Sequence, residues 1–529
     1  MSEQGTLDPA GLQVLIARLS GIAHEMGAVL RRGAFSPNIK ERADCSAAVF
    51  DPEGRMLAQA EHIPVHLGSM PASGAAVIDA LGDELGPGDQ ALLNDPFAGG
   101  THLNDLTVVA PCWVDGELVG WVANRAHHAD VGGAAPGSLP ADATDIHQEG
   151  LRIPPVRCTP EVRALLLANS RTGAERSGDL DAQLGANVVG VRRLAELAGS
   201  PFAEVLAHGE RRARAAIAAL PDGEWTAEDV LDSVGPAEAQ RSPSVIRCTV
   251  RTHGDGITFD FAGSAAQRPG NTNAVEAVTV SAVAFALRSA LDPGLPANAG
   301  TMEPVRVVAP ARTVVAATHP SAVGAGNVEV SQRVTDVCLL ALAQLLPERV
   351  PAASQGTMNN VLLGGFGGGG PWVYYETGAG GQGGRPVDPR NGAPRPGVSG
   401  VHTGMTNTLN TPIEALERAF PMRVRRYRLR RGSGGAGASP GGEGIERDLE
   451  VLVDVTASLI TERRTSQPWG LAGGEPGAVG ENWLLPQGDE SRAERLPDKC
   501  TVQLHAGDVV RMLTPGGGGW GSTTSEGDT

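Results

Sequence analysis

Histidines are concentrated in one part of this sequence. Of the 12 histidines in the chain, six lie within residues 62–147, where an even spread would place about two. These six are His62, His66, His102, His127, His128 and His147. Imidazole binds metal ions and transfers protons near neutral pH, so this concentration points to chemistry of one of these two kinds.

Carboxylates accompany the histidines in the segment 94–133. This segment holds His102, Asp105, His127, His128 and Asp130. Imidazole nitrogen and carboxylate oxygen are ligands that suit zinc, manganese or iron. The alternative is that the histidines are hydrogen-bonded structural residues beneath a glycine-rich loop. Metal binding is therefore the hypothesis, and a structural role is its alternative.

A β-hairpin would bring two of these histidines together. Residues 106–114 and 117–126 are apolar and rich in β-forming types, and the Asp-Gly pair between them is typical of a two-residue turn. With that turn, His127 lies opposite Asn104, and His102 is its diagonal neighbour on the same face. Asp105 then points to the other face, unless the strand begins after it or a bulge turns it.

A second predicted hairpin adds another carboxylate. Strands over 45–50 and 55–60, joined by a four-residue turn, place Asp44 near Glu61 at the open end of the hairpin. His66 follows in a tight segment and is either a structural residue or a proton relay. His147 and Glu149 either line the same site or belong to a solvated loop.

Composition limits the classes of function. The formal net charge of −17 and the pI near 5.2 argue against a nucleic-acid surface or an anionic membrane as partner. The chain has only two lysines, Lys40 and Lys499, and no G-x-x-x-x-G-K-[ST] motif. A P-loop is therefore excluded, and any ATP used in the reaction is expected on another chain.

Cellular location is predicted from what the sequence lacks. The first residues have neither a basic segment nor an apolar one, and no run approaches 18 apolar residues. Six cysteines are widely spaced without a C-x-x-C pair, which indicates neither a disulfide framework nor a zinc ribbon. We expect a soluble, cytoplasmic protein.

The chain is too long for one core, and its patterns favour an α+β fold with several domains. We expect mixed β-sheets with flanking helices and a β-rich, glycine-rich C-terminal part. The predicted divisions are an N-terminal metal-site region (1–158), a helical region (159–240), an α/β central region (241–420) and a β-rich C-terminal region (421–529).

Individual elements follow from periodicity and capping residues. Asp8-Pro9 begins a long amphipathic helix, and Thr159-Pro160 begins a helical stretch that reaches about residue 220. We expect that stretch to be interrupted at Gly173, at Gly178 and near 199–201. Residues 328–346 suit a buried helix. Arginines alternating with apolar residues over 423–431 predict a strand with one cationic face, at a solvated edge or a subunit interface.

Several motifs resemble one protein family, that of hydantoinase B and oxoprolinase. The resemblance begins with Asp44 and covers essentially the whole chain. The motifs are IPVHLGSM (63–70), NDPFAGGTHLNDLTVV (94–109), ANRAHHADVGG (123–133), SGDLDAQ (177–183), NTNA (271–274), GNVEVSQR (326–333), HTGMTNTLNTPIE (402–414) and TPGGGGWG (514–521). This family includes the B subunit of N-methylhydantoinase, the α subunit of acetone carboxylase, the C-terminal half of 5-oxoprolinase and the smaller subunit of caprolactamase.

The resemblance implies one half of a two-subunit enzyme. The companion A subunit of the family has an actin-like ATPase fold and phosphorylates a carbonyl oxygen, and the B subunit completes hydrolysis or carboxylation near a divalent metal. The family's metal ligands fall on Asp44, His102, Asp105 and His127. The metal would be zinc, manganese or iron, and an A2B2-type hetero-oligomer is expected.

The expected function is the metal-bearing B subunit of an ATP-dependent cyclic amidase that acts on hydantoins, 5-oxoproline or a lactam. Candidates for the proton-transfer step are His128, Asp130 and His66, with Glu149 as a further one. One alternative is a subunit of an ATP-dependent ketone carboxylase of the acetone or acetophenone type. The other is a non-catalytic partner whose metal only holds loops together.

Overall fold

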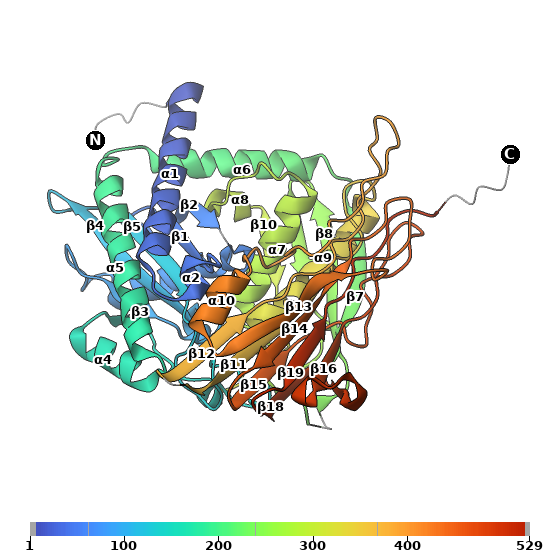
Figure 1. Ribbon diagram of the computed structural model, residues 1–529. Helices are drawn as coiled ribbons and strands as arrows, with labels where there is room; N and C mark the ends of the chain where they lie inside the picture. The colour runs from blue at the N-terminus through green and yellow to red at the C-terminus, as the bar shows by residue number, and fades with distance from the viewer. Residues whose placement is uncertain (1–6, 62, 238–239, 368, 524–529) are drawn as a thin grey trace.

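A computed structural model describes residues 7–61, 63–237, 240–367 and 369–523 of the chain. Helices and four β-sheets are mixed along the sequence, which confirms the α+β prediction (Figure 1). The helices are α1 (Pro9–Gly33), α2 (Pro37–Lys40), α3 (Ser69–Leu81), α4 (Pro160–Asn169), α5 (Gly173–Ala195), α6 (Phe202–Ala218), α7 (Glu276–Ala290), α8 (Ala299–Met302), α9 (Ser331–Leu345) and α10 (Ile413–Ala419). Among the described residues, no helix is both long enough and apolar enough to cross a membrane.

The first sheet carries the histidine-rich hairpin. Its strands lie in the order β2 (Met56–Glu61), β1 (Cys45–Phe50), β5 (Glu117–His127), β4 (Asp105–Val114), β3 (Ala91–Leu93) and β6 (Val156–Arg157). Helices α1 and α5 lie side by side on one face of this sheet (Figure 1). Helix α3 packs against the other face. Because both faces are covered, even the polar side chains at the ends of β4 and β5 are buried.

The second sheet packs against helix α9, and helix α7 packs on α9 in turn. Its strands lie in the order β10 (Val305–Val308), β9 (Gly256–Asp260), β8 (Ser244–His253) and β7 (Gly223–Leu231), and β10 pairs with β9 in parallel. The strands in contact with α9 are β7 and β8. The largest hydrophobic core joins these elements, so α9 is held on several sides.

The C-terminal part is built from two sheets that face each other. One contains β12 (Gly370–Glu376), β11 (Asn360–Gly367), β15 (Val455–Ile460) and β18 (Lys499–Leu504). The other contains β13 (Met422–Arg430), β14 (Gly444–Val451), β19 (Val509–Leu513), β16 (Glu481–Leu485) and β17 (Glu494–Leu496). Apolar residues of both sheets share one core, as in a β-sandwich (Figure 1).

The predicted arginine strand is β13, at the edge of the five-stranded sheet. Several of its arginines pair with acids of the neighbouring β14. Arg425 contacts Glu450, and both Arg426 and Arg428 contact Glu446. The cationic strand is thus neutralised within its own sheet.

The helix from Pro9 is confirmed, and its N-cap is Asp8, whose side chain accepts a hydrogen bond from Gly11 N at 2.7 Å. The predicted break at Gly178 was wrong, because α5 runs through it. At that position a Cβ atom would lie 2.4 Å from the ring of Phe35, so the glycine serves close packing rather than ending the helix.

The register of both N-terminal hairpins differs from the prediction. In the first hairpin Ser46, not Asp44, lies opposite Glu61. In the second, His127 lies opposite Asp105, not Asn104. The reason in the second case is a bulge, since Trp113 pairs with Leu118 while Cys112 pairs with Gly120, which leaves Val119 as an extra residue on β5.

Candidate metal centre

Three side chains of metal-ligand type converge at the open end of the β4–β5 hairpin. His102 Nε2 lies 3.1 Å from Asp105 Oδ1, and His127 Nδ1 lies 3.2 Å from the same oxygen. The two ring nitrogens are 3.2 Å apart. The three atoms therefore form a nearly equilateral triangle, and all three residues are at most 2 % exposed.

The bulge decides that Asp105 belongs to this triangle. In an unbulged hairpin Asp105 and His127 would point to opposite faces, because side chains alternate along a strand. The extra residue on β5 shifts the pairing by one, so Asp105 and His127 become direct partners and point to one side.

The triangle has the dimensions of a metal site. The edges between ligands of a tetrahedral ion bound at about 2.0–2.1 Å are about 3.3 Å long, close to the distances found here. His102 Nδ1 lies 3.2 Å from the carbonyl oxygen of Gly324, so Nδ1 carries the proton of the neutral ring and Nε2, on the side of the triangle, can then bind an ion. His127 Nε2 is buried and has no hydrogen-bond partner among the described residues. The donor set therefore fits a divalent ion.

Hydrogen bonds orient the carboxylate of the triangle. Asp105 Oδ2 accepts a bond from Thr101 Oγ1 at 2.6 Å and another from Asn327 Nδ2 at 3.2 Å. His66 Nε2 lies 3.5 Å from the same oxygen, and His66 Nδ1 lies 2.9 Å from Ser46 Oγ. His66 is thus the predicted proton-transfer candidate that the fold brings into contact with the triangle.

The charge states of two of the three residues, His127 and Asp105, suit metal binding. Burial lowers the pKa of His127 to about 3, so its ring is neutral near pH 7. Burial works to raise the pKa of Asp105, but the charge of His102 and hydrogen bonds from the three histidines outweigh it and hold that pKa well below its ordinary value. A neutral imidazole and an ionised carboxylate are the forms that bind metals.

Asp44 lies beside the triangle rather than in it. Its backbone oxygen accepts a hydrogen bond from His127 N at 3.1 Å. Asp44 is 7 % exposed, and its carboxylate is not one of the three groups that form the triangle. Burial raises the pKa of Asp44 to about 7, and the nearby negative charge of Asp105 adds to this effect.

The remaining predicted residues have other contacts. His128 Nε2 lies 2.8 Å from Gln183 Oε1 on α5. Asp130 accepts hydrogen bonds from Gly132 N, Gly137 N and Arg171, so it ties the glycine-rich loop together. Neither of these side chains is among the three that form the triangle.

Glu149 is connected to the triangle through Gly324, whereas His147 lies at the surface. Glu149 is buried and accepts hydrogen bonds from Val323 N and Gly324 N, and the oxygen of Gly324 contacts His102. His147 is exposed, with its ring edge-on to His319. His62, which belongs to the histidine-rich segment, lies outside the described residues.

Two residues at the site were not foreseen from the sequence. Asn327 Nδ2 lies 3.1 Å from His102 Nε2 and also donates a hydrogen bond to Asp105. The ring of Tyr375 stacks on His127 with centroids 4.7 Å apart, and the guanidinium of Arg42 lies 4.9 Å from the centre of the Tyr375 ring. Asn327 belongs to the motif GNVEVSQR, and this motif could have marked Asn327 as a site residue. No spacing rule, however, links Asn327 to a hairpin that lies over 200 residues earlier in the chain.

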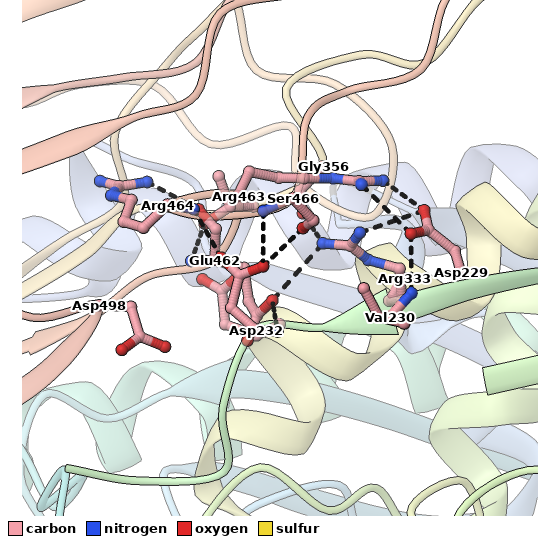
Figure 2. Close-up of polar contacts among 12 residues, drawn as sticks. Asp229, Val230, Asp232, Arg333, Gly356, Glu462, Arg463, Arg464, Ser466 and Asp498 are labelled. Atoms are coloured by element: carbon pink, nitrogen blue, oxygen red, sulfur yellow. Dashed lines mark hydrogen bonds and ion pairs between the residues drawn. The ribbon is translucent and has the colours of Figure 1, made fainter. Parts of the chain in front are cut away.

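A buried ionic cluster fixes the helix that follows Asn327 (Figure 2). Asn327 belongs to the π-helical turn Gly326–Val330, which leads directly into α9. On α9, Arg333 contacts Asp229 at 3.1 Å, and Asp229 also binds Arg463 at 2.7 Å. Arg463 follows β15, so the cluster joins the C-terminal sandwich to the central sheet through α9 (Figure 2).

The same cluster contains one of the two lysines. Lys499 is fully buried, and its Nζ lies 2.6 Å from Glu462 Oε1 and 2.9 Å from Asp498 Oδ2. Asp232 accepts hydrogen bonds from Arg464 N and Ser466 (Figure 2). These contacts immobilise the segment that packs against α9.

Comparison with known proteins agrees with the sequence motifs. Residues 8–523 match the Hydantoinase B/oxoprolinase family, and the chain belongs to this family. An uncharacterized protein of Methanocaldococcus jannaschii is 40% identical, over 98% of this chain and 91% of its own length. A protein of a Pseudomonas species, named as a candidate B subunit of a D-/L-hydantoinase, is 30% identical, over 98% of this chain and 90% of its own length.

Longer relatives match this chain over only one part of their own length. 5-oxoprolinase 1 of Arabidopsis thaliana is 35% identical over 98% of this chain, but the match spans only 42% of the relative. Several other relatives named 5-oxoprolinase are matched over a similar share of their length. This chain thus corresponds to less than half of those proteins.

Two solved structures have the same fold. The ATP-dependent caprolactamase from Pseudomonas jessenii aligns with a TM-score of 0.87 and 28% identity, over 98% of this chain and 92% of that one. An acetone carboxylase aligns with a TM-score of 0.87 and 19% identity, over 97% of this chain and 76% of that one. At this lower identity the second likeness concerns the fold alone.

Proposed function

We propose that this protein is the metal-bearing B subunit of an ATP-dependent cyclic amidase. The observation that carries the proposal is the buried triangle of His102, Asp105 and His127. Relatives named 5-oxoprolinase and the likeness to a caprolactamase support a cyclic amide as substrate. A hydantoin, 5-oxoproline or a lactam is the expected substrate class.

The partner is an A-type subunit that binds ATP and phosphorylates the ring carbonyl. Support comes from the relative named as a candidate B subunit of a hydantoinase. We expect an A2B2-type assembly in which this chain receives the phosphorylated ring.

His102, Asp105 and His127 would hold the ion, with Asp44 as a fourth ligand, and the donor set suits zinc, manganese or iron. A bound divalent ion supplies a water that loses its proton near neutral pH and a positive charge that stabilises developing oxyanions. Thr101 and Asn327 fix the Asp105 carboxylate, and Tyr375 covers the His127 ring against solvent.

His66 is the residue that we propose for proton transfer, because its Nε2 lies 3.5 Å from Asp105 Oδ2 and its Nδ1 is oriented by Ser46. The contacts of His128 with Gln183 and of Asp130 with the glycine-rich loop favour positioning roles for these two residues. His128 lies one residue after His127 and Asp130 lies three residues after it. Both therefore also affect the site through the backbone.

The test is coupled turnover by the chain copurified with its A-type partner. Hydantoins, 5-oxoproline, lactams and ketones are assayed for phosphate release and product, with and without bicarbonate. Ring opening coupled to phosphate release is expected. A carboxylated product formed only with bicarbonate would instead assign the ketone carboxylase function, for which the fold shared with acetone carboxylase is the supporting observation.

A variant separates a catalytic metal from a structural one. His127→Ala is expected to lose bound metal and to reduce ring opening by at least a hundredfold while the complex still assembles. His147→Ala is the matched control, because His147 is exposed and is not one of the three residues of the triangle. A His127→Ala complex with full ATP-dependent turnover would favour the non-catalytic partner.

A further inference from the structure

The two histidines of the triangle are held in different ways. His102 Nδ1 lies 3.2 Å from the carbonyl oxygen of Gly324, and such a bond from the nitrogen that does not bind the ion orients the ring in most metal sites. His127 lacks this support, because its Nε2 is buried and has no hydrogen-bond partner among the described residues. An imidazole turns readily about the bond to its Cβ atom, so another contact has to fix the ring of His127.

A stack of flat groups supplies that contact. The ring of Tyr375 on β12 lies against the ring of His127, with centroids 4.7 Å apart and planes inclined by 23°. The guanidinium of Arg42 lies over the ring of Tyr375, 4.9 Å from its centre. All three residues are at most 2 % exposed. In such close packing, rotation of the imidazole would drive one of its edges into the phenol ring, so the stack restricts the ring of His127 to its present plane.

The hydroxyl of the tyrosine is held by the helical turn beside the triangle. Tyr375 Oη donates to Asn360 Oδ1 at 2.9 Å, and Asn360 Nδ2 donates to Glu329 Oε1 at 2.8 Å. Glu329 belongs to the π-helical turn Gly326–Val330, which also carries Asn327. The turn that contacts the carboxylate of the triangle therefore also supports the ring that stacks on its second histidine.

Arg42 holds the backbone of the tyrosine as well as its ring. Its guanidinium donates to the carbonyl oxygen of Tyr375 at 2.5 Å, to Asn38 Oδ1 at 3.1 Å and to Thr377 Oγ1 at 3.2 Å. These three acceptors are neutral, and a cation is attracted to the face of an aromatic ring, more strongly where both groups are away from water. Arg42 follows α2 whereas Tyr375 is on β12, so these contacts join the N-terminal part of the chain to the C-terminal sandwich.

We propose that Tyr375 is a positioning residue of the metal centre, an inference that rests on the function proposed above. Its ring orients the imidazole of His127 by stacking, in the place of a hydrogen bond, and keeps Nδ1 on the side of Asp105. The C-terminal sandwich carries none of the three residues of the triangle. By this inference it is nevertheless required for full metal affinity.

The test measures metal binding by the full chain. Zn²⁺ affinity is obtained by competition with a chromophoric chelator, and Co²⁺, which absorbs visible light, reports the geometry of its ligands. Tyr375→Leu removes the flat ring and is expected to weaken Zn²⁺ binding about 10- to 100-fold and to alter the visible spectrum of bound Co²⁺. Tyr375→Phe keeps the ring, so its affinity should stay within about threefold of the unchanged chain and its Co²⁺ spectrum should be the same.

Tyr427→Leu is the matched control. The ring of Tyr427 also has a guanidinium over it, that of Arg447 at 5.4 Å, but it lies on β13 at the surface. Circular dichroism checks folding, and Tyr375→Met, of similar volume but not planar, takes the place of Tyr375→Leu if the leucine variant does not fold. Equal Zn²⁺ affinities for Tyr375→Leu and Tyr375→Phe, or equal weakening by Tyr427→Leu, would overturn the proposal.

Failure of this inference and failure of the proposed function are distinguishable, because the measured quantity is metal binding and not turnover. A chain that binds Zn²⁺ with the expected dependence on Tyr375, but opens no ring with its A-type partner, would contradict the proposed reaction alone. Coupled ring opening by the unchanged chain, together with the same Zn²⁺ affinity and Co²⁺ spectrum for Tyr375→Leu, would contradict the positioning role alone. Absence of any binding of zinc, manganese or iron by the unchanged chain would overturn both.

Discussion

Asp105 lies directly opposite His127 in the β4–β5 ladder because β5 carries one extra residue, Val119. We therefore expect that deletion of Val119 restores the unbulged register, with Asn104 opposite His127 and Asp105 on the other face. The deletion variant should lose metal binding at least a hundredfold. Metal content and competition titration with a chromophoric chelator measure this.

Val119→Ala keeps the extra residue and serves as the control for that deletion. Its metal affinity should stay within about twofold of the unchanged chain, because the register depends on the number of residues and not on this side chain. Circular dichroism of both variants checks that they are folded. A folded deletion variant with unchanged metal affinity would show that the bulge does not position Asp105.

Asn327 is expected to tune metal affinity without being required for the fold. Its side-chain amide donates to Asp105 Oδ2 and touches His102 Nε2, so Asn327→Leu frees the carboxylate to rotate. We predict a loss of metal affinity of about 10- to 100-fold, as for other residues that orient metal ligands. Asn391→Leu, at an exposed position, is the control. Equal affinities for both variants would remove Asn327 from the site.

The buried ionic cluster is expected to stabilise the whole chain. Lys499→Met leaves the buried carboxylate of Glu462 without its closest cation, and loss of one partner of a buried pair costs about 3–5 kcal/mol. Urea denaturation measures the free energy of unfolding. Arg247→Met removes an exposed ion pair with Glu228 and should cost less than about 1 kcal/mol. Similar losses from the two substitutions would argue against a special role of the cluster.

Glu329 should make stability depend on pH. Burial, together with the negative charge of Glu462, raises the pKa of Glu329 to about 8. Between pH about 4.5 and 8 the folded chain keeps a proton that the unfolded chain releases, so its contribution to stability falls as the pH rises through this window.

Glu329→Gln should remove this dependence, because the amide resembles the protonated carboxyl. The unfolding constant of the unchanged chain is divided by that of the variant. This ratio should rise about tenfold per pH unit from pH 5 to 8 and stay constant above pH 8. Urea denaturation at several pH values measures the ratio. Glu224→Gln, which removes a carboxylate from an exposed ion pair, is the matched control. A flat ratio for Glu329→Gln would contradict the raised pKa.

The local elements could be predicted because their causes lie within a few residues. The Asp-Gly turn and the apolar runs on either side predicted the β4–β5 hairpin, which the structure confirms. The cap at Asp8 and the helical periodicity after it predicted α1. The convergence of His102 and His127 at one end of the hairpin also followed from this local pattern.

The register depended on contacts that the sequence does not display. At Gly120, next to the bulge, a Cβ atom would lie 2.3 Å from the carbonyl oxygen of Phe50, so β5 approaches β1 too closely there for another residue type. This approach belongs to the packing of the whole sheet. A pairing rule that counts residues from the turn could not include it. By that rule Asp105 joins the site only if a bulge turns it, and the bulge at Val119 does so.

The sequence by itself determined the hairpins, the helices and the residue types able to bind a metal, because propensity and periodicity act over short distances along the chain. Only the tertiary structure decided which of these residues meet. Asn327, Tyr375 and Glu149 reach the site from separate segments, and the ionic cluster on α9 holds Asn327 there. Such contacts arise from burial of distant segments in shared cores, and no local pattern encodes that geometry.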